Sequence, residues 1–324
     1  MSKRLRTVTA LAALAGLSTL STPRSMPQAA AAQPYKIVLI AGIASDAFYI
    51  TMNHGAQAEA LKEGATVQFS GSPAAFSPST QLPYLNAAIA QKPDLILIAP
   101  TDKVALQEPI ARAAAAHIPV ILVDTTLNDP SVAVTTISSD NVAGGQKVAD
   151  ALAGAIGKTG KVAIVSVSPG ISTTDERVEG FNKELAQYPS IKSLGVTFTG
   201  DNPTRANTVT KGLVAANNDL AGVFATNVVT GGGVTAAARE LGLSGKLKLV
   251  EFDAEPEQVA AVKAGTIAAL VAQDPYHIGE LGVQYGIAYL KGKRDFDKHY
   301  GTGEAIITKD NVDSADVKNY LYSR

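Results

Sequence analysis

The segment 95–124 reads LILIAPTDKVALQEPIARAAAAHIPVILVD. It begins with the apolar run Leu95–Ile98 and ends with the run Val120–Val123 and Asp124, with a longer alanine-rich stretch between them. Short uninterrupted apolar runs are typical of strands buried on both faces of a parallel sheet, and the stretch between them is typical of the returning helix. The segment therefore predicts one strand, helix, strand unit of an α/β fold.

The same unit recurs along the chain. A first series of apolar runs lies at 37–40, 66–69, 95–98 and 120–123, and their starts are about 25–30 residues apart, the period of such a unit. A second series lies at 162–167, 195–199, 222–225, 247–252 and 267–272. Between the two series, residues 142–156 form a helical pattern that Gly157 can close with left-handed backbone. The sequence therefore predicts two doubly wound parallel-sheet domains, with the first crossing between them near Ser138.

The N-terminal residues have the order of a secretory signal peptide. Lys3, Arg4 and Arg6 precede an almost uncharged run at 8–20 and a small-residue stretch that ends at Ala32, which predicts a signal peptide over 1–32 with cleavage near Ala32. Cleavage removes four basic residues and no acidic one, so 28 basic residues become 24 against 29 acidic ones, a net charge of −5. We therefore expect a periplasmic protein that binds neither nucleic acid nor an anionic membrane. The chain has no cysteine, which excludes a lipid-anchored N-terminal cysteine.

Polar residues follow several of the predicted strands. In open parallel sheets, ligands bind outside the carboxyl ends of the strands. Asp and Asn at these places often only end a strand or cap a helix, but their recurrence in both series indicates a binding site. Carboxylates accept hydrogen bonds from several hydroxyls, amides both donate and accept, and aromatic rings offer an apolar face, which together suit a polyhydroxylated ligand. The residues concerned are Asp46 with Phe48 and Tyr49, Thr101 with Asp102, Asp124, Asn227, Asp253, and Gln273 with Asp274.

Signals for catalysis are weak. The run Gly231-Gly232-Gly233-Val234-Thr235-Ala236 satisfies the loose dinucleotide fingerprint, with Asp253 about 20 residues further on. Its first glycine stands several residues beyond the strand, whereas a dinucleotide turn needs it immediately after the strand. The four histidines show no metal-ligand spacing. We therefore expect no enzyme activity, no metal and no cofactor, and keep an enzyme on a Rossmann-like fold as the less favoured alternative.

The chain resembles the ribose-binding-protein type of periplasmic receptors for ABC sugar importers, which have the periplasmic binding protein-like I fold. The resemblance runs from Lys36 to about Asp310. Its most specific pieces are Ala99-Pro100-Thr101-Asp102, Ile118-Pro119-Val120, Ser138-Ser139-Asp140-Asn141 with Gly144-Gly145, Glu176-Arg177 with Glu179-Gly180-Phe181, Val223-Phe224-Ala225-Thr226-Asn227, Phe252-Asp253 and Ala272-Gln273-Asp274-Pro275.

The resemblance implies a ligand site and two interwoven domains. The implied ligand-binding residues are Asp46, Phe48, Tyr49, Asp124, Arg177, Asn227, Phe252, Asp253 and Gln273. The implied N-terminal lobe comprises 36–138 and 274–302, and the C-terminal lobe comprises 139–273 and 303–324, with a three-strand hinge near Ser138, Gln273 and Gly303.

The chain also departs from the ribose-binding pattern. Asp46 and Ala99 each replace an asparagine, Thr125 replaces an arginine, and Asn202-Pro203 stands where that pattern has an aromatic residue. These differences argue against ribose and leave another pentose, a hexose or a linear sugar alcohol open.

The resemblance implies the function of a monomeric periplasmic binding protein that clamps a monosaccharide or sugar alcohol and delivers it to an ABC transporter permease. A receptor for a small signalling molecule, feeding a sensor or a chemoreceptor, uses the same kind of pocket and remains the alternative. A sugar-sensing repressor needs an N-terminal DNA-binding domain, and the first predicted strand begins too early for one.

Overall fold

The computed structural model describes residues 33–73 and 75–322, with the isolated residues 1 and 7. The expected signal peptide, 1–32, and its cleavage site near Ala32 otherwise lie outside the described residues. The chain divides into the units Met1–Gln33 and Pro34–Arg324, and the second unit contains all the helices and strands described below. Among the described residues, no helix is both long and apolar enough to cross a membrane.

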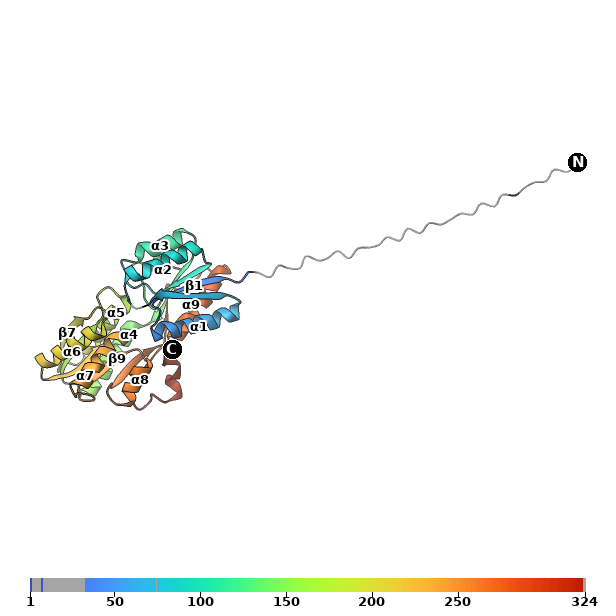
Figure 1. Ribbon diagram of the computed structural model, residues 1–324. Coiled ribbons are helices and arrows are strands. Elements are labelled where there is room, and N and C mark those ends of the chain that lie inside the picture. The colour runs from blue at the N-terminus through green and yellow to red at the C-terminus, as the bar shows by residue number, and fades with distance from the viewer. Residues whose placement is uncertain (2–6, 8–32, 74, 323–324) are drawn as a thin grey trace. The chain divides into compact units, whose positions relative to one another are not determined.

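Domain A is built on a six-stranded parallel sheet, sheet A (Figure 1). Helices α2 (Pro78–Gln91) and α3 (Gln107–Ala115) cover one face, and helices α1 (Ala47–Glu63) and α9 (Pro275–Leu290) cover the other. Alternate residues of the first strand supply the two cores, because Val38 and Ile40 pack towards α2 and α3 while Ile37 and Leu39 pack towards α1 and α9. The strands, in spatial order, are β11 (His299–Thr302), β5 (Thr136–Ser139), β4 (Val120–Val123), β3 (Leu95–Ile98), β1 (Lys36–Ile43) and β2 (Thr66–Ser72).

Domain B repeats this architecture on a second six-stranded sheet, sheet B. Helices α4 (Asn141–Ala155) and α5 (Ser172–Leu185) cover one face, and α6 (Pro203–Ala216), α7 (Val228–Glu240) and α8 (Pro256–Lys263) cover the other. The edge strand β12 is antiparallel to β10, whereas the remaining strand pairs are parallel. The strands, in spatial order, are β12 (Glu304–Ile307), β10 (Ala269–Gln273), β9 (Lys248–Phe252), β8 (Leu220–Ala225), β6 (Gly160–Ser166) and β7 (Ile191–Phe198).

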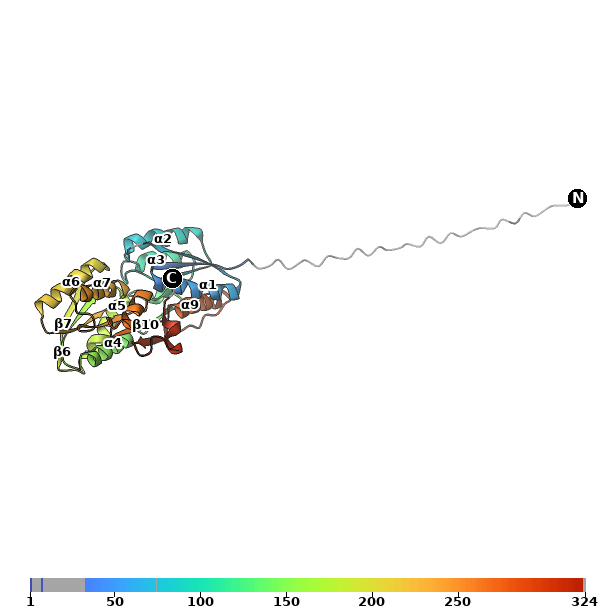
Figure 2. The same cartoon turned by 60° about the horizontal axis from the view of Figure 1, so that its bottom comes forward.

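The chain passes between the two sheets three times. Strand β5 of sheet A leads into α4 of domain B, and β10 of sheet B leads into α9 of domain A (Figure 2). The third passage is at Gly303, which alone separates β11 of sheet A from β12 of sheet B. Two 3₁₀ helices, η1 (Pro130–Val132) and η2 (Ala315–Tyr320), complete the structure. The two domains are thus interwoven, and the predicted fold of two parallel-sheet α/β domains is confirmed.

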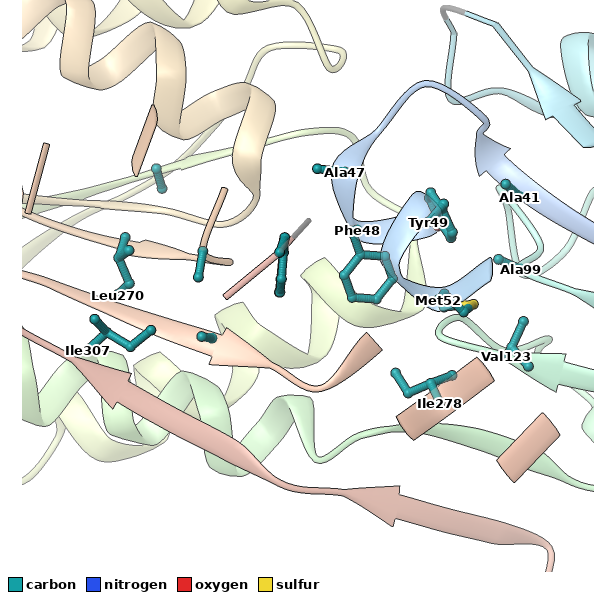
Figure 3. Close-up of a cluster of buried hydrophobic side chains, with 14 of the residues drawn as sticks. Ala41, Ala47, Phe48, Tyr49, Met52, Ala99, Val123, Leu270, Ile278 and Ile307 are labelled. Carbon is teal, nitrogen blue, oxygen red and sulfur yellow. The ribbon is translucent and has the colours of Figure 1, made fainter. Parts of the chain in front are cut away.

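One hydrophobic cluster runs from domain A into domain B. Figure 3 shows Phe48 at the start of α1, between Met52 and Ile278 of domain A and Leu270 and Ile307 of sheet B. The start of α1 is therefore held where the two domains meet.

Glycines allow helix pairs to lie close together. A Cβ at Gly180 of α5 would collide with the backbone of α4, and one at Gly145 of α4 would collide with the carbonyl of Arg177. Gly55 of α1 and Gly279 of α9 have the same relationship in domain A. The close approach of α4 and α5 fixes the position of Arg177, a residue of the predicted ligand site.

The observed strands agree closely with the apolar runs where both strand faces are buried. Strands β3 and β4 begin and end at the predicted residues, whereas β7 begins at Ile191, four residues before the predicted start at 195. Strands β11 and β12 were not among the predicted runs. Both are four-residue segments with mixed exposure, so they lack a continuous apolar run.

Candidate functional site

A cleft lies at the carboxyl ends of the strands of both sheets. It encloses about 510 Å³ of space not filled by protein atoms, counting the solvent at its mouth. The cleft is lined by Ile43, Asp46, Phe48, Tyr49, Phe76 and Asp124 of domain A and by Val167, Ile171, Thr173, Thr174, Arg177, Asp201, Asn227, Val228, Asp253 and Gln273 of domain B or its junction with domain A.

The structure brings eight of the nine predicted residues to this cleft. Phe252 is the exception, because its ring is fully buried and does not line the cavity. The ring instead lies under the guanidinium of Arg177, 3.9 Å from its Cζ to the ring centroid. The structure therefore places Phe252 one layer behind the cleft, where it supports Arg177 by a cation–π contact.

In domain A, the aromatic pair and two aspartates are linked. Tyr49 donates a hydrogen bond from its hydroxyl to Oδ2 of Asp124 over 2.7 Å. Asp46 caps α1 by accepting a hydrogen bond at Oδ1 from the backbone N–H of Phe48 over 2.8 Å. The rings of Phe48 and Tyr49 meet edge to face, with centroids 5.1 Å apart. Phe48 therefore offers an apolar surface to the cleft, while Tyr49 also orients a carboxylate.

In domain B, Arg177 is buried and held from several sides. Its Nε donates to Oδ1 of Asn141 over 2.9 Å, and its Nη1 donates to the carbonyl of Thr226 over 2.8 Å. A guanidinium has five N–H donors, and these two bonds use two of them. Arg177 is fixed before any ligand arrives, because Asn141, Thr226 and the Phe252 ring all constrain it.

Asp253 and Gln273 form a second linked group. Asp253 accepts at Oδ1 from Nε2 of Gln273 over 2.7 Å and at Oδ2 from the backbone N–H of Val228 over 3.2 Å. The Oε1 of Gln273 is buried and has no hydrogen-bond partner among the described residues. A buried acceptor without a partner is costly, so this oxygen is a favourable acceptor for a ligand hydroxyl.

Asn227 has two tasks. Its Oδ1 accepts from the backbone N–H of Thr230 and completes a capping box at the start of α7. Its Nδ2 donates to Oδ1 of Asp201 over 2.9 Å. Asn227 therefore caps a helix, as Asp and Asn after a strand often do, and its side chain also lines the cleft with Asp201.

Three of the cleft aspartates have left-handed backbone. The φ angles are 64° at Asp124, 53° at Asp201 and 78° at Asp253. Asp124 directly follows β4 and Asp253 directly follows β9, which occupy equivalent places in the two sheets. Non-glycine residues seldom adopt this conformation, Asp being among the more tolerant, and such conformations concentrate at functional sites.

The cleft contains more acidic than basic groups. Asp46, Asp124, Asp201 and Asp253 line it with a single guanidinium, that of Arg177. Burial raises the pKa of Asp124 to about 6, although the hydrogen bond from Tyr49 and the charge of Arg177 act in the opposite direction. Burial is also the main cause that raises the pKa of Asp46, well above its usual value, and that of Asp201. Asp124, Asp46 and Asp201 are therefore costly to ionise where they are buried, and ligand hydroxyls can supply hydrogen-bond donors to them.

Some cleft residues were missed by sequence reasoning. Asp201 comes from the loop before α6, and Thr173 and Thr174 from the first turn of α5, so none of them directly follows an apolar run. Conversely, Asp102 does not line the cleft. Its Oδ1 accepts from the backbone N–H groups of Val104 and Ala105, so it stabilises a turn.

The glycine run of α7 has a packing role. A Cβ at Gly231 would collide with the side chain of Glu251, and one at Gly233 would collide with the carbonyl of Pro203. These glycines therefore let α7 lie close to sheet B and α6. Among the described residues, no group of acidic or histidine side chains has the arrangement of a metal site.

The two domains also touch beside the cleft. Nζ of Lys103 lies 2.8 Å from Oδ2 of Asp175, and the backbone N–H of Thr126 donates to Oγ of Ser172 over 2.9 Å. Lys103 and Thr126 belong to domain A, and Asp175 and Ser172 to α5 of domain B. The structure is therefore in a closed arrangement in which both domains contribute to one cleft.

One chain that passes three times between two α/β domains, with a polar cleft between them, defines a two-domain solute-binding protein. Residues 37–294 match the family model described as "Periplasmic binding protein domain". The ribose import binding protein RbsB of Haemophilus influenzae is 31% identical over 258 residues, which cover 80% of this chain and 86% of that protein. The chain therefore belongs to the periplasmic binding protein family, and the resemblance to its ribose-binding type is confirmed.

Solved structures agree with this assignment. An ABC transporter solute-binding protein from Agrobacterium vitis, bound with α-D-tagatopyranose, superposes with a TM-score of 0.87 at 42% identity, covering 90% of this chain and 100% of that one. A second from Agrobacterium vitis, with bound D-fucose, has a TM-score of 0.84 at 32% identity and covers 89% and 100%. These relatives are transport solute-binding proteins rather than enzymes.

Proposed function

We propose that this chain is the periplasmic substrate-binding component of an ABC sugar importer. Its two domains clamp one monosaccharide or sugar alcohol and deliver it to the membrane permease. The protein acts as a monomer, because two domains that open and close around a ligand need no second copy. Export by the N-terminal segment and release into the periplasm belong to the same proposal.

One observation carries the choice of ligand class: the polar groups of the cleft are mainly hydrogen-bond acceptors, and both domains supply them. Asp46 and Asp124 lie on one side, Asp201 and Asp253 on the other, and the free oxygen of Gln273 lies beside Asp253. A neutral ligand with several hydroxyl groups donates to all of these oxygens. An acidic sugar or a phosphorylated sugar would instead place its negative charge against the carboxylates.

The remaining cleft groups fit the same ligand class. The donors of Arg177 can bind two adjacent ligand oxygens, and the rings of Phe48 and Phe76 can contact the C–H face of a sugar. Hydrogen bonds to charged groups contribute about 1.5–3 kcal/mol each, so a ligand that misplaces one hydroxyl loses considerable affinity. The cleft is therefore expected to distinguish epimers.

The bound ligands of the structural relatives supply the first candidates. The 42%-identical relative holds a tagatopyranose, and the 32%-identical relative holds D-fucose. The departures from the ribose-binding pattern at Asp46 and Thr125 leave a hexose of this kind open. Thr125 turns away from the cleft and donates to the carbonyl of Pro100 over 2.8 Å, so no arginine-like donor comes from this position.

A thermal-shift screen of the ligand-stripped mature protein tests the proposal. The panel contains D-tagatose, D-fucose, D-ribose, xylitol, D-galacturonate and a set of nucleosides. A ligand at 100 times its dissociation constant adds about 2.7 kcal/mol of stability. We expect a clear shift with one or two related neutral sugars or polyols and none with D-galacturonate. Absence of a shift with every sugar and polyol would contradict the proposal and favour a non-sugar signalling ligand.

A further inference from the structure

The C-terminal segment reaches the ligand site. After η2, the chain places Tyr322 in a buried position, where 5% of its surface is exposed. Its backbone N–H donates to the carbonyl of Ala254 over 3.1 Å, next to Asp253. Tyr322 is therefore fixed to domain B immediately behind the cleft, although it lies far from the other site residues in sequence.

The hydroxyl of Tyr322 is part of the Asp253 and Gln273 group. It donates to Oδ1 of Asp253 over 2.9 Å and accepts from the backbone N–H of Gln273 over 3.3 Å. Oδ1 of Asp253 thus receives two donors, from Tyr322 and from Nε2 of Gln273. A carboxylate oxygen has about two acceptor positions, so Oδ1 is saturated from behind the cleft.

Two oxygens of the Asp253 and Gln273 side chains remain able to accept hydrogen bonds from a ligand. Among the described residues, Oδ2 of Asp253 accepts the backbone N–H of Val228 alone, which leaves one acceptor position. Because the amide nitrogen of Gln273 is committed to Asp253, its Oε1 remains an open acceptor. Tyr322 thereby fixes two neighbouring acceptors, Oδ2 of Asp253 and Oε1 of Gln273, to which two ligand hydroxyls can donate.

The ring of Tyr322 also crosses the domain boundary. It meets the ring of Phe48 edge to face, with centroids 5.6 Å apart and an interplanar angle of 69°. Phe48 starts α1 of domain A and lines the cleft. One side chain therefore contacts a binding residue of each domain in the closed arrangement.

We propose that Tyr322 is a positioning residue of the ligand site: its hydroxyl holds the Asp253 carboxylate and the Gln273 amide in the orientation that accepts ligand hydroxyls, and its ring supports Phe48 on closure. The proposal rests on the proposed sugar-binding function. The C-terminal segment is then part of the binding site rather than an end of the chain that only covers sheet B.

The test uses Tyr322→Phe, which removes the hydroxyl and keeps the ring. Tyr188→Phe is the matched control, because Tyr188 also donates to a carboxylate, Oδ1 of Asp150, over 2.7 Å, at the surface of domain B and away from the cleft. Both variants and the wild type are titrated calorimetrically with D-tagatose, D-fucose, D-ribose and xylitol. Ligand dissociation is followed by stopped-flow fluorescence, and thermal unfolding is measured without ligand.

We expect Tyr322→Phe to weaken binding of the preferred sugar about tenfold, mainly through faster dissociation, because Asp253 and Gln273 are coupled to Tyr322 in one hydrogen-bond network and lose their accepting orientation without its hydroxyl. We expect Tyr188→Phe to bind like the wild type. Wild-type affinity in Tyr322→Phe, with or without lowered thermal stability, would show that the residue is only structural and overturn the inference. If the wild type binds none of the four ligands, the proposed function fails and the inference fails with it.

Discussion

Replacing Asp124 by Asn should raise the free energy of unfolding of the ligand-free protein and lower its affinity for the ligand. Burial raises the pKa of Asp124 from 3.8 to about 6. The folded protein therefore binds the proton of the Asp124 carboxyl group more tightly than the unfolded chain does. The stabilising contribution of the protonated form is fully present below about pH 4 and is lost as the pH rises through about 6.

The size of the effect follows from the two pKa values. A difference of about two units corresponds to about 3 kcal/mol at pH values well above 6. An asparagine has no charge to desolvate, and its Oδ1 can still accept the hydrogen bond of Tyr49. We therefore expect Asp124→Asn to exceed the wild type by up to about 3 kcal/mol near pH 8, and by only about 1 kcal/mol near pH 4.5.

Denaturant unfolding of the ligand-free mature proteins at the two pH values measures this difference. Asp150→Asn is the matched control, because Asp150 also accepts a tyrosine hydroxyl but lies exposed on the surface. Calorimetric titration with D-tagatose should show at least about tenfold weaker binding by Asp124→Asn than by the wild type, because an ionised acceptor is lost. A variant that is no more stable than the wild type at pH 8, or that differs equally at both pH values, would refute the electrostatic reasoning.

Three further results are expected. Ligand hydroxyls favour the ionised form of Asp124, so calorimetric affinity should be constant above about pH 7 and fall by up to about tenfold per unit below about pH 6. Gly180→Ala should lower the free energy of unfolding by about 1–3 kcal/mol and weaken sugar binding, because it displaces α5 and with it Arg177. Lys103→Met should weaken binding by no more than about fivefold, since partly exposed ion pairs contribute about 1 kcal/mol or less, and 1 M NaCl should reduce the difference from the wild type.

The fold was predictable wherever burial is continuous. Strands β3 and β4 are buried on both faces, so their apolar runs gave the observed ends. Strand β7 lies at the edge of sheet B and is largely half-exposed, so polar residues such as Lys192 and Ser193 concealed its start. Strands β11 and β12 are held by backbone pairing with β5 and β10, and backbone pairing leaves no pattern of apolar residues in the sequence.

The site was predictable to the extent that strands carry it. Asp124, Asp253 and Gln273 lie at the ends of the apolar runs, and the parallel sheets bring such ends together. Asp201 lines the cleft from a loop, and Tyr322 contacts Asp253 from the C-terminal segment. Neither residue follows an apolar run, so the sequence pattern did not place either of them at the site. Phe252 was placed among ligand contacts by resemblance, but burial behind Arg177 gives it a supporting position.

The most direct test of the account is a parallel calorimetric titration of the ligand-stripped wild type and of Asp253→Ala with D-tagatose, D-fucose, D-ribose and xylitol. Circular dichroism verifies that both proteins are folded. The account predicts that the wild type binds one of these ligands with a stoichiometry of one, and that Asp253→Ala shows no detectable binding while keeping a folded spectrum. Near-normal affinity in the variant would contradict the assignment of the cleft as the binding site.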